Sequence, residues 1–367
     1  MQKRKILKIF LLYFIGIQIA TAQSPLKTND SIQQKKWVDS LLQKMTVDQK
    51  IGQLFMLAAY SNKDQKHIDF IQSVIKKHEI GGLIFMQGTP EKQVALTNFY
   101  QKSSKTPLLI GFDGEWGLDM RLKDTYRFPW NMTLGAIRDN QLIEEFGKRL
   151  GQQCKRMGIH VNFAPVVDIN TNPKNPIIGN RSFGENKYNV TQKALAFTKG
   201  IQSEHVLACA KHFPGHGDTN SDSHKTLPTV NFTAERMDSV ELYPYKVLFK
   251  NGLASIMAAH LNVPSLTLND NLPTSLSYKV LTELLRNKLK FKGLVFTDAL
   301  NMKGVSTFVE GNLDSDKSNS MKRKIDLKAF LAGNDVLLFS EDVASAKAQI
   351  KNALKNKSLS MERLNQS

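Results

Sequence analysis

The sequence predicts an α/β protein whose single catalytic domain folds as a closed (β/α)8, TIM-like barrel. Short, nearly continuous apolar runs alternate along the chain with segments that have the spacing of amphipathic helices. Such alternation is typical of parallel strands joined by helices and buried on both faces. The count of eight runs favours a closed barrel over an open doubly wound sheet, the second choice. The runs are residues 54–58, 82–86, 108–112, 161–167, 206–210, 255–259, 294–296 and 336–339.

The N-terminus has the pattern of a secretory signal peptide, residues 1–22. A basic start precedes a short apolar run, 9–19, and Ala20-Thr21-Ala22 forms an A-x-A cleavage site. An uncleaved anchor is the alternative, although the run is short for a full span. We therefore expect an exported, periplasmic or secreted protein without a stable membrane span after cleavage. The four basic residues of this segment are Lys3, Arg4, Lys5 and Lys8.

Removing those four residues lowers the formal net charge from +17 to +13. A solvated, Lys-rich surface is the favoured interpretation, with attraction to anionic polymers or envelope surfaces as the alternative. The sequence has no basic-aromatic motif of a nucleic-acid-binding protein, so we expect no nucleic-acid partner. The two cysteines, Cys154 and Cys209, lie in apolar patterns and are predicted to be core thiols. We expect a monomer.

The predicted domain covers residues 37–355, after a polar linker at 23–36. It begins with an amphipathic helix at Trp37 and a short turn that Thr46 caps. The clearest helix is 139–158, with Asp139 as N-cap and Gly158 at its end. Residues 356–367 form a C-terminal tail in which a new helical pattern starts, so truncation or loss of a further domain are alternatives left open.

A barrel of this kind places its active residues at the carboxyl ends of the strands. Polar residues lie just past five of the apolar runs, so we expect them to lie at one end of the barrel. They are Asp113, Asp168, Lys211 with His212, His260 and Asp298. No Gly-x-Gly-x-x-Gly or Walker sequence follows the first run, and nucleotide binding is not predicted.

The loop that begins at Lys211 concentrates titratable groups. Its glycines and its Thr219-to-Ser223 run predict an irregular segment. Near its end, Asp222 and His224 are two residues apart and would share a side of an extended segment. Asp222 would then orient His224 and favour its imidazolium, which suits a general acid and base. His216 and Asp218, between the two halves, are assigned to loop structure.

Two other groups could bind a saccharide. Asp113 with Arg121 suits vicinal hydroxyls, and Arg181 lies in the loop after the fourth run; ion-paired loop structure is the alternative for both. Asp298 follows a mostly apolar run, so its backbone is anchored in the barrel wall. A rigidly held, ionised carboxylate suits covalent displacement at an anomeric carbon, and Lys211 or Arg181 would keep it ionised.

These residues form long, ordered motifs. Lys211-His-Phe-Pro-Gly-His-Gly-Asp-Thr is followed by Asp222-Ser-His224, and Asp298 stands in Phe-Thr-Asp-Ala-Leu-Asn-Met302. Ile178-Gly-Asn-Arg-Ser-Phe-Gly184 and Pro273-Thr-Ser-Leu-Ser277 belong to the same pattern. The chain, from about Met45 to Lys355, closely resembles the bacterial β-N-acetylglucosaminidases of glycoside hydrolase family 3.

The resemblance implies a retaining, exo-acting enzyme that removes terminal β-linked N-acetylglucosamine. Asp298 would be the nucleophile, and His224, paired with Asp222, the acid and then the base. The sugar would be bound by Asp113, Arg121, Arg181, Lys211 and His212. No metal or cofactor is implied, and peptidoglycan fragments or chitin-type saccharides are the expected substrates.

Two positions depart from the family pattern. Trp116 replaces a glycine after Glu115, where an indole would narrow the site or stack on a sugar, and Ala299 stands where an acidic residue is common.

Three rival functions stay open. The first is a glycoside phosphorylase, because a histidine acid/base would repel the attacking phosphate less than a carboxylate would. The second is a metallohydrolase that uses the histidines and aspartates of the loop. The third is a non-catalytic saccharide-binding protein.

Overall fold

The computed structural model describes residues 31–221, 227–268, 272–302, 305 and 324–367. These residues form eight parallel strands in the order β7-β6-β5-β4-β3-β2-β1-β8. A parallel bridge between Phe296 and Val336 brings β7 next to β8, so the barrel is nearly closed. The strands are β1 (Phe55–Ala59), β2 (Gly82–Phe85), β3 (Leu109–Phe112), β4 (Val161–Asn162), β5 (Leu207–Phe213), β6 (Ser255–Ala258), β7 (Leu294–Thr297) and β8 (Leu337–Leu338).

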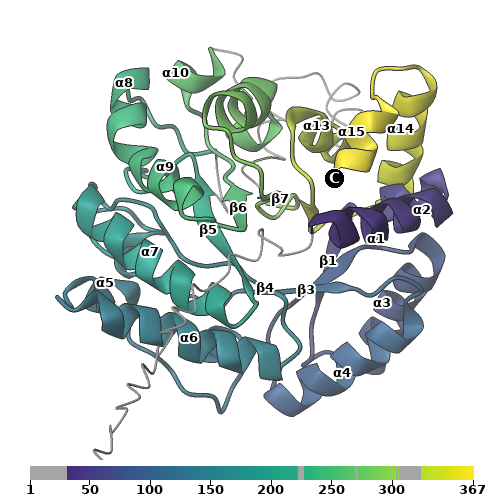
Figure 1. Ribbon diagram of the computed structural model, residues 1–367, viewed down its shortest axis with the longest axis horizontal. Coiled ribbons are helices and arrows are strands. Elements are labelled where there is room, and N and C mark those ends of the chain that lie inside the picture. Colours follow the sequence, from purple (N-terminus) through teal and green to yellow (C-terminus); the bar gives the residue numbers. More distant parts are fainter. Residues whose placement is uncertain (1–30, 222–226, 269–271, 303–304, 306–323) are drawn as a thin grey trace, which may run out of the picture.

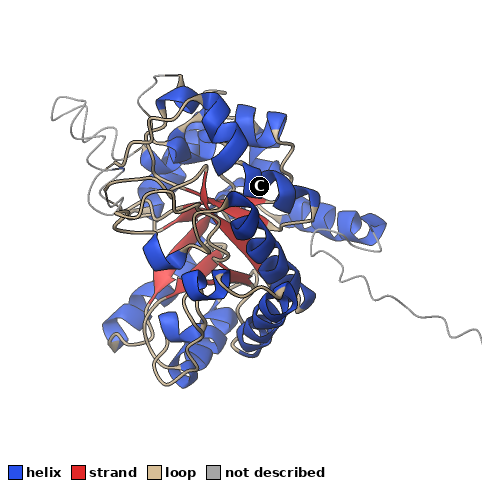
Figure 2. Ribbon diagram, turned by 90° about the vertical axis from the view of Figure 1, so that its left-hand side faces the viewer, coloured by secondary structure: helices blue, strands red, loops and turns tan. Residues whose placement is uncertain are grey.

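Helices surround the strands, which lie at the centre of the molecule (Figures 1 and 2). The α-helices are α1 (Ser31–Lys44), α2 (Val47–Gly52), α3 (Gln65–His78), α4 (Pro90–Ser103), α5 (Asn131–Gly135), α6 (Asn140–Arg156), α7 (Lys187–Ser203), α8 (Ala234–Arg236), α9 (Tyr243–Lys250), α10 (Pro264–Thr267), α13 (Ile325–Ala332), α14 (Val343–Lys355) and α15 (Met361–Gln366). Short 3₁₀ or π-type helices are η1 (Leu118–Met120), η2 (Gly179–Arg181), η3 (Met237–Glu241), η4 (Thr274–Leu276) and η5 (Lys279–Lys288).

Helix α2, near the start of the described chain, meets the last two helices, α14 and α15 (Figure 1). Lys347 of α14 pairs with Asp48 of α2 at 2.7 Å, and Lys50 donates to Asn365 of α15 at 2.9 Å. Helix α2 begins with a capping box between Thr46 and Gln49, because each side chain binds the other's backbone N–H.

The barrel interior is filled by one large apolar side chain from most strands. At β3 the position is Gly111, where an added Cβ would lie 2.7 Å from the ring of Phe163, so only glycine fits. The rings of Phe163 and Phe296 meet edge to face, with centroids 5.2 Å apart. The buried cluster consists of Met56, Ile84, Val161, Phe163, Cys209, Met257, Phe296, Val336 and Leu338.

The predicted barrel is confirmed, with shifts at some element ends. Helix α1 begins at Ser31, six residues before Trp37, and none of its side chains is buried. Asp139 caps α6, whose apolar face is buried as predicted. The run at 161–167 forms a two-residue strand, because Pro165 has no N–H to continue the ladder. Both cysteines are buried free thiols.

Strand β5 corrects one prediction. The sequence places the strand end at Ala210, whereas β5 continues to Phe213. Lys211 and His212 are polar yet buried within the strand, because the site supplies partners for both side chains. The peptide bonds that precede His212 and Pro214 are cis.

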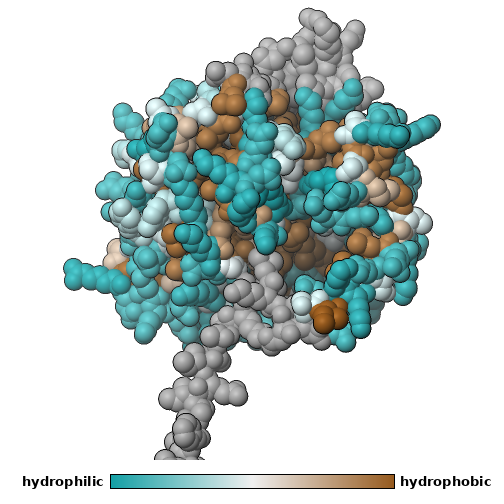
Figure 3. Space-filling model, turned by 45° about the horizontal axis from the view of Figure 1, so that its top comes forward, coloured by the Kyte–Doolittle hydropathy of each residue, from teal (hydrophilic) through white to brown (hydrophobic). Residues whose placement is uncertain are grey.

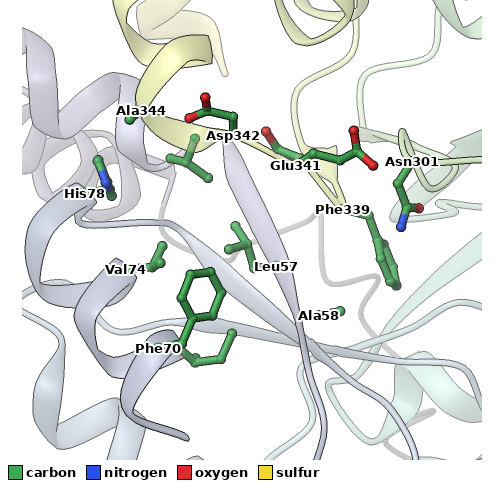
Figure 4. A pocket seen from close by; sticks show the side chains of 13 residues that line it. Leu57, Ala58, Phe70, Val74, His78, Asn301, Phe339, Glu341, Asp342 and Ala344 are labelled. Carbon is green, nitrogen blue, oxygen red and sulfur yellow. The ribbon is translucent and has the colours of Figure 1, made fainter. Parts of the chain in front are cut away.

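A cavity of about 310 Å³ lies outside the barrel, between α3 and the segment that joins β8 to α14 (Figure 4). Leu57, Phe70 and Val74 line one side, and Phe339 and Asn301 lie on the other. None of the five predicted sugar-binding residues is among its described lining.

Polar side chains spread over the face shown in Figure 3 between smaller apolar patches. In the described part of the chain, no helix has the length and apolar character needed to cross a bilayer.

Candidate active site

Four charged side chains form a buried network at the carboxyl ends of β3 and β5. Lys211 Nζ lies 2.9 Å from Asp113 Oδ1 and 2.8 Å from Glu115 Oε1. Arg121 Nη2 pairs with the other oxygen of Asp113 at 2.6 Å. Because the two carboxylates and the two cations alternate, each buried charge has an opposite partner. The network brings Asp113, Arg121 and Lys211 together as predicted.

Arg181 joins this network from the loop after β4. Its Nε and Nη2 donate to the two oxygens of Glu115 at 2.9 and 2.7 Å, a bidentate pair that fixes the guanidinium plane. The same Nη2 lies 3.3 Å from Nε2 of His212. The five predicted sugar-binding residues therefore form one continuous set, with Glu115 as its buried centre.

Asp168 holds His212 in place. Its Oδ2 lies 2.7 Å from Nδ1 of His212, and its Oδ1 accepts the backbone N–H groups of His212 and His216, at 3.2 and 2.7 Å. The carboxylate thus orients the ring and leaves Nε2 facing Arg181. From the sequence, Asp168 was expected at a strand end but without a role, and Glu115 was also without one. The signal for both was a carboxylate close behind an apolar run, since Asp168 directly follows the run at 161–167 and Glu115 lies three residues past the run at 108–112.

The pKa values of the network carboxyls are low. Burial raises the pKa of Asp113, but Lys211 and Arg121 outweigh it and hold that pKa well below its usual range. Burial also raises the pKa of Glu115, yet Arg181 and Lys211 bring it down to about 2. The same carboxylates raise the pKa of Lys211 against the effect of its own burial. The network is therefore fully ionised at neutral pH.

Asp298 lies directly after β7, as predicted, and its side chain is partly buried. Burial raises its pKa, but the charges of His260 and His212, the N–H of Ala299 and the charge of Lys211 together lower it. The sequence predicts that Lys211 or Arg181 keeps Asp298 ionised. The two histidines contribute more than Lys211.

The first half of the loop that follows β5 is tied to the loop that follows β4. Thr171 donates to Asp218 at 2.9 Å, and His216 Nδ1 lies 2.7 Å from the hydroxyl of Thr219. At Gly217 an added Cβ would lie 1.9 Å from the carbonyl oxygen of Ile169, so the two loops touch backbone to backbone. His216 and Asp218 make contacts of loop structure, as predicted.

The predicted acid/base pair, Asp222 and His224, lies outside the described residues, as does the predicted signal peptide. Among the residues that the structure does describe, no group of three or more His, Cys, Asp or Glu side chains is placed to hold a metal ion.

The family model described as the glycosyl hydrolase family 3 N-terminal domain matches residues 46–367. The chain belongs to this family. It is 33% identical over 330 residues to β-hexosaminidase A of Pseudoalteromonas piscicida, across 81% of this chain and 53% of that protein. The chain thus spans about half the length of this curated relative.

Two solved structures superpose on most of the chain. A β-N-acetylglucosaminidase of Paenibacillus sp. str. FPU-7 is 33% identical, with a TM-score of 0.78 over 88% of this chain and 60% of that one. A β-glucoside phosphorylase is 26% identical, with a TM-score of 0.84 over 94% of this chain and 60% of that one.

Trp116, a predicted departure from the family pattern, packs against a second indole. Its ring centroid is 4.3 Å from that of Trp130. The guanidinium of Arg127 lies over both rings, 5.8 Å from Trp116 and 4.9 Å from Trp130. The indole therefore packs with its own loop, and the sequence prediction that it narrows the site or stacks on a sugar stays a prediction.

Glu115→Gln is expected to destabilise this family 3 barrel. The amide leaves Arg181 and Lys211 without their shared carboxylate, and breaking a buried ion pair costs about 3–5 kcal/mol of unfolding free energy. Because the folded pKa of Glu115 is about 2, below the ordinary 4.5, its contribution is present above pH 4.5 and is lost as the pH falls towards 2. Urea unfolding between pH 7 and pH 2 measures both effects.

The matched control is Glu144→Gln, which neutralises an exposed carboxylate on α6. We expect it to unfold like the wild type at every pH. If Glu115→Gln also matched the wild type at pH 7, the buried network would contribute nothing to stability.

Proposed function

We propose that this protein is a retaining, exo-acting β-N-acetylglucosaminidase. Asp298 attacks the anomeric carbon and forms a covalent glycosyl-enzyme, while His224, oriented by Asp222, protonates the leaving oxygen and then activates water. Asp113, Arg121, Arg181, Lys211 and His212 bind the sugar. The observation that carries the proposal is the place of Asp298 directly after β7, with its side chain partly buried at the same end of the barrel as the five predicted sugar-binding residues.

The geometry suits a sugar more than a charged ligand. Carboxylates and cations alternate in the network, so it offers both acceptors and donors to hydroxyl groups. These donors and acceptors lie at the carboxyl ends of the barrel strands, which is where barrel enzymes bind their substrates. The names of the β-hexosaminidase and β-N-acetylglucosaminidase relatives support an acetamido sugar over glucose.

One assay tests this function directly. Full-length protein is offered an aryl β-N-acetylglucosaminide and an aryl β-glucoside, and release of the aryl alcohol is followed. We expect the acetamido substrate to have the higher kcat/KM by at least about 10-fold. A site that hydrogen-bonds the amide of its substrate discriminates against a substrate without it, because the polar groups of the site are then left unpaired. Preference for the glucoside would reject the proposed substrate.

A glycoside phosphorylase is the second candidate, because a phosphorylase is among the matching structures. In that reaction phosphate replaces water in the second step, and its oxygen takes the sugar from Asp298 to give a sugar 1-phosphate. Product analysis in phosphate and in a phosphate-free buffer separates the two. Under the hydrolase proposal, free N-acetylglucosamine forms in both buffers.

We also propose that the protein is exported and acts on peptidoglycan fragments or chitin-type saccharides. The basic and apolar pattern of residues 1–22 supports export. Activity in the periplasmic or secreted fraction, with processing after Ala22 shown by mass spectrometry, is the expected result. Activity confined to the cytoplasm would contradict it.

A further inference from the structure

His260 lies two residues past β6 and is fully buried, yet it has no part in the sugar-binding set. Its ring connects two segments that are distant in sequence. Nδ1 lies 2.6 Å from the hydroxyl oxygen of Ser275, and Nε2 lies 3.0 Å from the backbone carbonyl oxygen of Ala299. Ala299 directly follows Asp298.

The chemistry of the partners defines the role of each ring nitrogen. A carbonyl oxygen only accepts hydrogen bonds, so Nε2 carries a proton and donates to Ala299. A hydroxyl can donate or accept, so Ser275 satisfies Nδ1 in either charge state of the ring. Both nitrogens are therefore held, and the ring cannot rotate without breaking two buried hydrogen bonds.

The segment around Asp298 is held on three sides. The N–H of Asp298 donates to Ala258 of β6 at 2.9 Å, and the N–H of Leu300 donates to Leu338 of β8 at 3.0 Å. Neighbouring strands thus hold the N–H groups of this segment, and His260 holds its Ala299 carbonyl. The N–H of Ala299 in turn donates to Oδ1 of Asp298 at 2.8 Å, which orients the carboxylate.

Ser275 is itself a rigid support. Its N–H donates to Ala259 at 3.1 Å, and its carbonyl accepts from the side chain of Asn334 at 2.9 Å. The side chain of Ser275 has no exposed surface. The hydroxyl that holds His260 is therefore fixed in η4, which Ala259 and Asn334 hold in place.

We propose that His260, held by Ser275, is a positioning residue for Asp298. Through the carbonyl of Ala299 it fixes the backbone of the residue whose N–H orients the carboxylate, so that the reacting oxygen stays aimed at the anomeric carbon. The inference rests on the proposed function, in which Asp298 is the nucleophile. His260 also favours the ionised carboxylate, since its charge lowers the pKa of Asp298 against the effect of burial.

The test compares two replacements of His260. Gln places an amide donor near the position of Nε2, whereas Asn places its amide near Nδ1 and leaves Ala299 without a donor. We expect His260→Asn to lower kcat about 100-fold with little change in KM, because a small misplacement of a reacting group has this effect. His260→Gln should restore most of the lost kcat.

A leaving-group comparison separates positioning from a merely structural role. A misplaced nucleophile slows attack on every substrate, so His260→Asn should lower kcat for an activated aryl glycoside and for a disaccharide by similar factors. Thermal unfolding identifies any variant that fails to fold. Equal kcat for folded His260→Asn and the wild type, or equal losses in the Asn and Gln variants, would overturn the proposal.

Ser275→Ala provides a second route if His260→Asn does not fold. It removes the hydroxyl but keeps the imidazole, and we expect a smaller fall in kcat with the same indifference to the leaving group. Ser277→Ala is the matched control, since the Oγ of Ser277 is also buried but makes no hydrogen bond within the described structure. Wild-type kcat in Ser275→Ala would overturn the role of Ser275. Wild-type protein inactive on all β-glycosides would instead reject the proposed function.

Discussion

Asp298→Ala is expected to lower kcat on the order of 10⁴-fold or more, because it removes the group that forms the covalent intermediate. The fold should persist, since the backbone on both sides is bound to β6 and β8. Steady-state turnover of an aryl β-N-acetylglucosaminide measures the loss, and circular dichroism measures the fold. The exposed Glu144→Gln variant serves as the control and should retain full activity.

Azide gives this prediction a sharper form. In Asp298→Gly the space of the carboxylate is open, and an azide ion can attack the anomeric carbon from the same face. The leaving oxygen departs with a proton from the acid, and the product is an α-glycosyl azide. Azide-dependent turnover with this product is expected. A β-glycosyl azide, or activity in Asp298→Ala without any added anion, would show that another residue is the nucleophile.

His224→Ala is expected to have the second-largest effect, and the effect depends on the substrate. A disaccharide needs a proton on its leaving oxygen, so its kcat/KM should fall about 10²- to 10⁴-fold. An aryl glycoside with a strongly acidic leaving group needs little protonation, so its bond cleavage should be nearly unaffected. Turnover of a series of aryl leaving groups measures this difference as a steeper dependence on leaving-group acidity.

His205→Asn is a suitable control for that series. His205 is exposed and precedes β5, so it lies at the opposite end of the strand from His212. Asparagine suits its positive φ of 62°. If His224→Ala reduced all leaving groups equally, its role would be structural, and the acid would have to be sought elsewhere.

Local sequence patterns predicted most of the fold. The positions of strands and helices could be predicted from the period of their apolar residues, because a short segment of sequence is enough to show this period. Thr46 and Asp139 were recognised as caps because a helix N-terminus is satisfied by the residue beside it. The strand-end rule then placed Asp113, Lys211, His212 and Asp298 at one end of the barrel.

What the sequence determined by itself was therefore which elements form and which residues stand at the strand ends. The pairings were decided only by the tertiary structure. Glu115, past the end of β3, meets Lys211 of β5 across the intervening strand β4. His260, past the end of β6, meets Ala299, past the end of the neighbouring β7. No local sequence pattern predicts these contacts, because the direction in which each side chain points depends on how the strands pair in the barrel.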